Sequence, residues 1–149
     1  MRDVVTIDIA APLEDVARLF TDPRVSESWM RETRYEPLRG DQGSPGSKYR
    51  LVTKQMTFTA TVIARDLPHA SEILLEAPNV SVRVNGSFAA LTPAKTRVTS
   101  EELFTFKGLA GKAMSLLARR AIRKAHRDQM ESFKRFAEQG ITAPAARKA

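Results

Sequence analysis

Glu102 is the residue of this sequence best suited to chemistry, because an alternating pattern places its carboxyl group among apolar side chains. One side of the segment TRVTSEELFTF (96–106) carries Val98, Ser100, Glu102 and Phe104. A carboxylate on a core-facing side must be paired, hydrated in a cavity or protonated, since burying an isolated charge is costly. An inward Glu102 would orient a ligand or act as a general acid/base. The alternative is a register shift that turns Glu102 outward and Glu101 inward.

Other catalytic or metal-binding patterns are missing from the sequence. The chain has no cysteine, which excludes disulfides, thiolate metal sites and a cysteine nucleophile. His69 falls in the turn LPHA, and His126 falls on the border of a basic helical pattern, without the spacing of metal ligands. No nucleotide-binding glycine loop or hydrolase elbow occurs. The sequence therefore predicts no metal and no cofactor.

The elements that would position Glu102 begin with a strand and two short helices. Alternation over 4–10 predicts the strand. The segment APLEDVARLF (11–20) is typical of a first helix, with acidic residues near its positive end. Asp22 is the expected N-cap of a second helix that ends near Trp29.

A meandering antiparallel sheet is predicted over the middle of the chain. Short connections separate β-branched, alternating segments, as in successive hairpins. A shorter strand, interrupted by Pro37, is also indicated at 33–38. The other expected strands are 47–54, 56–66, 71–77, 80–91 and 96–106.

A long amphipathic helix is predicted to follow the sheet. It would span about 28 residues and end at Gln139, with Gly140 as its C-terminal stop. The net charge of +7 is concentrated there: residues 107–139 hold 9 Lys/Arg and 3 Asp/Glu, whereas residues 1–106 hold 13 and 14. We interpret most of this charge as a solvated outer face, with an acidic partner or an anionic membrane surface as the alternative. The charged face has no interleaved aromatic residues on which bases could stack, so nucleic-acid binding is not favoured.

The apolar side of this helix carries small side chains at its centre. Ala118, Ala121 and Ala125 lie between larger residues toward the two ends. Small side chains either let a helix press onto a sheet or leave a cavity beneath it. Both alternatives follow from the pattern.

The order of these elements resembles the SRPBCC, or START-like, superfamily, which includes Bet v 1-like proteins and the polyketide cyclase/dehydrase branch. The residues that carry the resemblance are VTIDIAAPLEDVARLFTDPRVSESW, GSKYRLV, VIARDLPHASEI, KTRVTSEELFTFKG and FKRFAEQ. The resemblance implies an α+β helix-grip fold: a curved antiparallel sheet of about six to seven strands around a long C-terminal α-helix. Residues 1–140 would form one domain and 141–149 a disordered tail. It also implies a cavity between sheet and helix for a lipid, sterol, polyketide or quinone.

Alternation and the helical arc give the expected cavity lining. Glu102 is the catalytic candidate, and the polar Tyr35, Tyr49, Thr53 and Ser100 could bond a ligand oxygen. The full set of expected ligand-binding residues is Trp29, Tyr35, Tyr49, Leu51, Thr53, Met56, Phe58, Ile73, Leu75, Val82, Val84, Phe88, Ser100, Phe104, Met114, Ala118, Ala121, Ile122 and Ala125.

Three functions remain open from the sequence. The first is a carrier that binds a hydrophobic or aromatic small molecule. The second is a polyketide cyclase/dehydratase-type enzyme that uses Glu102 or a tyrosine as acid/base. The third is an interaction module that uses the basic helix. The N-terminus is charged and lacks an apolar signal region, and no apolar run approaches the roughly 20 residues of a membrane span, so a cytoplasmic location is expected.

Overall fold

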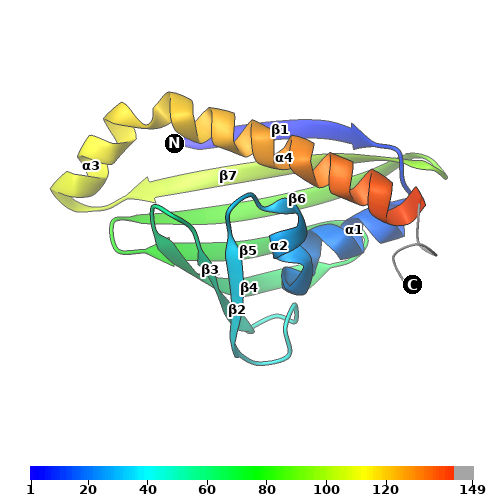
Figure 1. Ribbon diagram of the computed structural model, residues 1–149, viewed down its shortest axis with the longest axis horizontal. Coiled ribbons are helices and arrows are strands. Elements are labelled where there is room, and N and C mark those ends of the chain that lie inside the picture. Colours follow the sequence, from blue (N-terminus) through cyan, green and yellow to red (C-terminus); the bar gives the residue numbers. More distant parts are fainter. Residues whose placement is uncertain (143–149) are drawn as a thin grey trace.

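The computed structural model describes the backbone of residues 1–142 and the side chains of residues 1–139, so the expected tail at 141–149 lies almost wholly outside the described residues. Its framework is a curved seven-stranded antiparallel sheet in the order β1-β7-β6-β5-β4-β3-β2 (Figure 1). Each sequence-predicted strand, including the short one near Pro37, is present. The strands are β1 (Arg2–Ile9), β2 (Arg34–Arg39), β3 (Lys48–Val52), β4 (Thr57–Asp66), β5 (Ala70–Ala77), β6 (Val80–Thr92) and β7 (Lys95–Phe106).

The helices α1, α2 and α4 cover one face of the sheet (Figure 1). The Asp22 carboxylate accepts a hydrogen bond from the Arg24 backbone N–H at 3.0 Å, which confirms it as the N-cap of the second helical segment. The helices are α1 (Leu13–Thr21), a 3-10 turn (Pro23–Val25), α2 (Ser26–Trp29), α3 (Gly108–Leu117) and α4 (Arg119–Thr142).

The predicted single C-terminal helix is two helices. Ala118 leaves the helical region, with φ −104° and ψ 3°, and separates α3 from α4. Gly108 starts α3 with a φ of +67°, which glycine adopts without a Cβ clash. The predicted stop at Gly140 is wrong, because α4 continues to Thr142.

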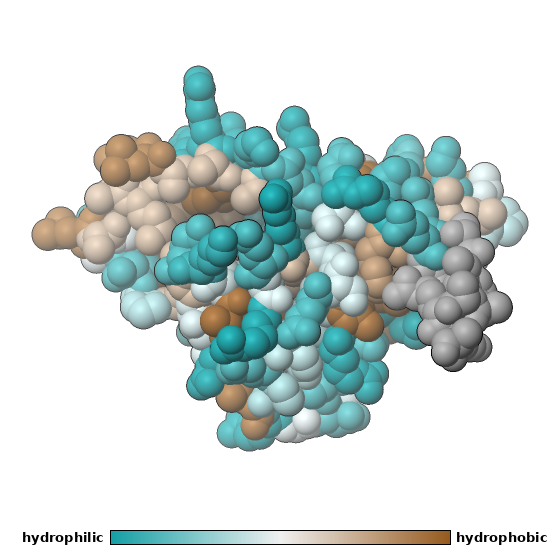
Figure 2. All heavy atoms as spheres, in the orientation of Figure 1, coloured by the Kyte–Doolittle hydropathy of each residue, from teal (hydrophilic) through white to brown (hydrophobic). Residues whose placement is uncertain are grey.

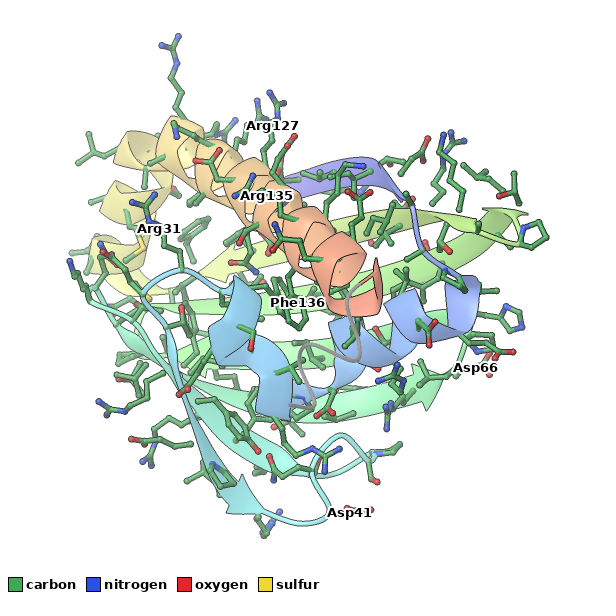
Figure 3. All side chains as sticks on the ribbon, turned by 45° about the vertical axis from the view of Figure 1, so that its right-hand side comes forward. Arg31, Asp41, Asp66, Arg127, Arg135 and Phe136 are labelled. Carbon is green, nitrogen blue, oxygen red and sulfur yellow. The ribbon has the colours of Figure 1, made fainter. Side chains whose placement is uncertain are left out.

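The most tightly packed part of the core lies where α1, α2 and the second half of α4 meet the sheet. Phe133 is fully buried, and its ring lies 4.9 Å from that of Trp29 and 5.2 Å from that of Phe20. Phe88 joins them through an edge contact with Phe20 at 5.4 Å. Figure 3 shows Phe136 on the side of α4 that faces the rest of the fold. This aromatic cluster anchors α4 against the sheet and leaves the other end of the interface less filled.

Candidate functional site

A cavity of about 190 Å³ lies between the sheet and the segment from α1 to α2, with α4 closing one side. Its walls are mostly apolar and come from strands β3 to β7. Because side chains alternate along a strand, each strand presents every second residue to the cavity. Of the expected lining residues, the structure places Trp29, Tyr49, Leu51, Thr53, Phe58, Ile73, Leu75, Val82, Val84, Ser100, Glu102 and Phe104 around it.

Four other expected lining residues do not line this cavity and pack instead against residues that do. The Tyr35 ring packs against the ring of Tyr49, with centroids 5.7 Å apart. The Tyr35 hydroxyl donates a hydrogen bond to Gln42 Oε1 at 2.7 Å. Phe88 belongs to the aromatic cluster. Met56 and Met114 pack against Val80, Val82 and Val84.

The residues that the C-terminal helix was expected to contribute to the cavity do not line it, and this part of the prediction is corrected. Ala121 and Ala125 are exposed, and Ala118 and Ile122 are half-buried without lining the cavity. The buried residues of α4 are instead His126, Met130, Phe133 and Ala137. The break at Ala118 resets the helical phase, so an arc drawn through both helices points in the wrong direction.

Ala125 lines a different feature, a surface groove between α4 and the segment that follows α2. Arg31, Arg127 and Arg135 lie along this groove (Figure 3). Glu27, Glu32, Asp128 and Glu131 lie there too, so the groove is not uniformly basic.

Further cavity residues were missing from the sequence-based set. The largest group comes from the helical segment between β1 and β2, where no period-2 pattern marks an inner side. Gln129 and Met130 come from α4, where the i, i+4 spacing from His126 to Met130 would have identified the correct face. The additional residues are Phe20, Thr21, Pro23, Ser26, Met30, Thr33, Gly43, Val62, Ala64, Arg65, Ser71, Gln129 and Met130.

Arg65 is the positively charged residue of the cavity wall, and a β-bulge in β4 accounts for its position there. The register between β4 and β5 shifts between Val62 and Ala64. Past such a shift the alternation reverses, so Arg65 is half-buried although the regular pattern predicts it outside. Its Nε donates a hydrogen bond to Thr21 Oγ1 at 3.3 Å, which ties β4 to α1.

Glu102 faces the cavity, as the alternating pattern of β7 predicted, and its side chain is 15% exposed. Burial, with a smaller contribution from the negative charge of Asp3, raises the pKa of this carboxyl to about 7. Asp3 is the cross-strand partner of Glu102 in the β1–β7 ladder, so the two acids are neighbours by register. Glu102 can therefore hold or release a proton near neutral pH.

His126 forms a buried polar cluster with three residues of β1 and β7, Asp3, Ser100 and Glu102. Its Nδ1 lies 2.8 Å from Asp3 Oδ2, and its Nε2 lies 3.0 Å from Ser100 Oγ. Glu102 Oε1 is 3.5 Å from the same Nδ1. Burial lowers the pKa of the imidazole, with Asp3 opposing the shift. A neutral ring then donates from Nδ1 to Asp3 and accepts the Ser100 hydroxyl proton at Nε2.

The position of His126 was not predicted. The basic residues around it suggested a helix border, whereas the residue is 3% exposed. Its partner Asp3 is 123 positions away in the chain, so no local pattern signals the contact. Asp3 also lies 3.8 Å from Arg123, which connects the cluster to the outer side of α4.

Trp29 leaves one hydrogen-bond donor in the cavity wall without a partner. Among the described side chains, its Nε1 is the buried polar atom for which no acceptor lies within reach. Buried donors are rarely left unpaired in native proteins.

In the described part of the chain, no group of three or more His, Asp or Glu residues has an arrangement that could hold a metal ion. Over the same residues, no helix combines the length and apolarity that a bilayer crossing requires.

Comparisons with known proteins identify relatives in sequence and in fold. Residues 3–138 match the family model described as polyketide cyclase / dehydrase and lipid transport. No curated protein matches the chain. Among solved structures, the Zhui aromatase/cyclase from Streptomyces sp. R1128 superposes with a TM-score of 0.79 at 16% identity, covering 97% of each chain.

Two further structures agree with this result. The hypothetical protein jhp0584 from Helicobacter pylori gives a TM-score of 0.74 at 13% identity, covering 92% of this chain and 88% of that one. A protein from Arthrobacter aurescens gives 0.71 at 16% identity, covering 93% and 86%. At these identities the likeness establishes the fold and leaves the chemistry to the residues of the site.

Proposed function

The chain belongs to the polyketide cyclase / dehydrase and lipid transport family, and from that premise we propose that its cavity binds a compact aromatic or hydrophobic carbonyl compound on which Glu102 acts as acid/base. The observation that carries the proposal is Glu102 itself, a cavity carboxyl with its pKa near 7. A general acid/base works best when its pKa lies near the working pH.

The size and polarity of the cavity limit the ligand. A volume of about 190 Å³ exceeds the ~150 Å³ of an engineered cavity that takes benzene, so one or two rings match the space. Trp29 Nε1 supplies a donor for a ligand oxygen, and Arg65 supplies a positive charge in the wall. A carbonyl held by such donors has acidified α-hydrogens.

The proposed proton transfer follows from this arrangement. The Glu102 carboxylate takes a proton from the carbon next to the ligand carbonyl, which leaves an enolate and a protonated Glu102. Returning the proton to the same carbon completes an exchange. Giving it to a leaving hydroxyl releases water, which is the dehydration step of a cyclase/dehydratase. His126 and Ser100 hold the neighbouring hydrogen bonds and keep Asp3 beside Glu102.

Binding can be tested with 2-tetralone, a bicyclic ketone with acidic α-hydrogens. Trp29 is the chain's single tryptophan and lines the cavity, so its emission reports occupancy. Titration should quench this emission saturably. Leu75→Phe, which fills the cavity, should abolish the quenching. Leu74→Phe, on the opposite side of the same strand, is the matched control and should bind normally. Equal quenching in both variants contradicts the cavity as the site.

Proton transfer can be tested with the same ketone in deuterated water. The chain should accelerate α-deuterium incorporation, followed by NMR. Glu102→Gln should slow it by at least about 100-fold while keeping the quenching, given typical contributions of a general base. Glu101→Gln is the control, since Glu101 faces away from the cavity and pairs with Arg2 at 2.6 Å. A Glu102→Gln variant that exchanges at the normal rate would leave a carrier without chemistry.

A second candidate function is contact with an anionic partner through the basic helices. The exposed Arg119, Arg120 and Arg127 favour it, because their side chains form no ion pair with another described residue. Replacing Arg120, Arg123 and Arg127 by Glu should abolish that contact and leave the quenching by 2-tetralone unchanged.

A further inference from the structure

The outward side of α3 is apolar, unlike the outward side of α4. Leu109, Leu116 and Leu117 are 88%, 81% and 88% exposed, about twice the exposure of any other large apolar residue among the described ones. Ala110 and Ala113 are exposed beside them. We name these five residues the leucine face. Contiguous exposed apolar side chains on a protein surface mark an interaction site.

The inner side of α3 fixes this orientation. A Cβ on Gly111 would lie 2.6 Å from the Asn79 carbonyl oxygen, so the helix rests directly on the β5–β6 turn. Lys107 N–H donates a hydrogen bond to the same oxygen at 2.8 Å, and Met114 packs onto the sheet beneath the helix. With Gly111 and Met114 inward, the leucines can only point to solvent.

Positive charge surrounds the leucine face. Lys107, Lys112, Arg119 and Arg120 are all exposed at its borders. The sequence has no Asp or Glu from Lys107 to Arg127. An apolar helical face bordered by cations is the pattern of helices that lie in the headgroup region of anionic membranes.

The shape of the molecule agrees with this occupant. α3 forms one end of the fold (Figure 1), and apolar atoms gather at the same end in the space-filling view (Figure 2). A protruding helix suits a lipid interface better than a groove-binding partner. A second copy of the chain is disfavoured, because joining two leucine faces would bring two sets of cations together.

We propose that α3 inserts Leu109, Leu116 and Leu117 into the headgroup region of an anionic lipid membrane. The inference deepens the second candidate function and does not depend on the chemistry of Glu102. It also relates the membrane to the cavity: Met114, on the underside of α3, packs in one cluster with Val82 and Phe104, which line the cavity. Docking would set this end of the cavity against the bilayer, where apolar compounds concentrate.

Vesicle sedimentation of the full chain tests the proposal. The chain should bind phosphatidylcholine vesicles that contain roughly a third phosphatidylglycerol, and bind pure phosphatidylcholine much more weakly. Leu109→Ser, Leu116→Ser and Leu117→Ser combined should reduce partitioning at least about tenfold. The matched control replaces three other exposed apolar residues, Leu38, Ile63 and Leu91, by Ser and should bind normally. Circular dichroism and 2-tetralone quenching check that each variant is folded.

Insertion itself can be read spectroscopically. Because the chain has no cysteine, Leu116→Cys carries a single environment-sensitive fluorophore. Its emission should shift to the blue on anionic vesicles and be quenched by brominated lipid, whereas a label at Leu91→Cys should not respond. Equal vesicle binding by the leucine and control variants would overturn insertion. A dimer in sedimentation velocity that the leucine variant loses would assign the face to a second copy. Neither result would bear on 2-tetralone binding in the cavity.

Discussion

The two ends of the space beneath α4 are built differently. At one end, α1 and α2 pack beside α4 on the sheet, and the rings of Phe20, Trp29 and Phe133 fill the interior. Beyond this cluster, strands β3 to β7 line a cavity that Phe20 and Trp29 bound on one side, and His126 lies in its polar cluster beside Glu102. The helices therefore close tightly on the sheet around Phe133, and leave room for a ligand over the strands next to Trp29 and Glu102.

The largest expected effect comes from truncating the packed end. Phe133→Ala should lower the free energy of unfolding by about 3–5 kcal/mol, because the ring is fully buried and a cavity would remain. Phe104→Ala, at the open end, should cost only about 1–2 kcal/mol, since that ring is half-buried beside an existing cavity. Urea denaturation of both variants measures the difference. Equal losses would contradict the contrast between the two ends.

The next effect is a pH-dependent destabilisation from Glu102 at the open end. The folded pKa is about 7 against an ordinary 4.5, so between these values the folded chain holds a proton that the unfolded chain has lost. Stability should fall as pH rises from 4.5 to 7, by about 3 kcal/mol in all. Glu102→Gln should remove this loss, making the variant the more stable protein at pH 8 and leaving little difference near pH 4.5. Thermal unfolding across this range provides the comparison, with Glu101→Gln as the control.

His126 should produce the opposite slope. Its folded pKa lies below the ordinary 6.5, so as pH falls below 6.5 the unfolded chain gains a proton that the folded chain resists. The stability that the neutral ring contributes is present above pH 6.5 and is lost below it. His126→Gln should remove that acid-side loss and lower stability at pH 8 by about 1–2 kcal/mol, because Asp3 and Ser100 lose a partner. A variant that keeps the wild-type slope below pH 6.5 would place the titrating group elsewhere.

The smallest effect concerns the boundary between the two ends. Ser132 Oγ donates a hydrogen bond to the Trp29 carbonyl oxygen at 2.7 Å and holds α4 to α2. Ser132→Ala should cost about 1 kcal/mol. It should also weaken 2-tetralone binding slightly, because Trp29 lines the cavity. Ser115→Ala is a suitable control, since Ser115 donates only within α3, to the Lys112 carbonyl oxygen.

How far the sequence predicts this molecule depends on the element. Strand patterns were readable because alternation is a local property of an extended chain, and Glu102 was located in this way. Arg65 was missed because one bulged position in β4 reverses the alternation after it. Ala121 and Ala125 were misplaced because a single residue, Ala118, breaks the helix and changes its phase.

By itself, therefore, the sequence determined the order of the elements, the antiparallel sheet, the inward side of each regular strand and the concentration of positive charge near the C-terminus. These features follow from periodicity and composition, which are properties of neighbouring residues. Only the tertiary structure decided that His126 is buried against Asp3 and Ser100, that Trp29 keeps an unpaired donor, and that α3 turns its leucines to solvent. Each of these depends on contacts between residues far apart in the chain, and such contacts arise only when the helices close on the sheet.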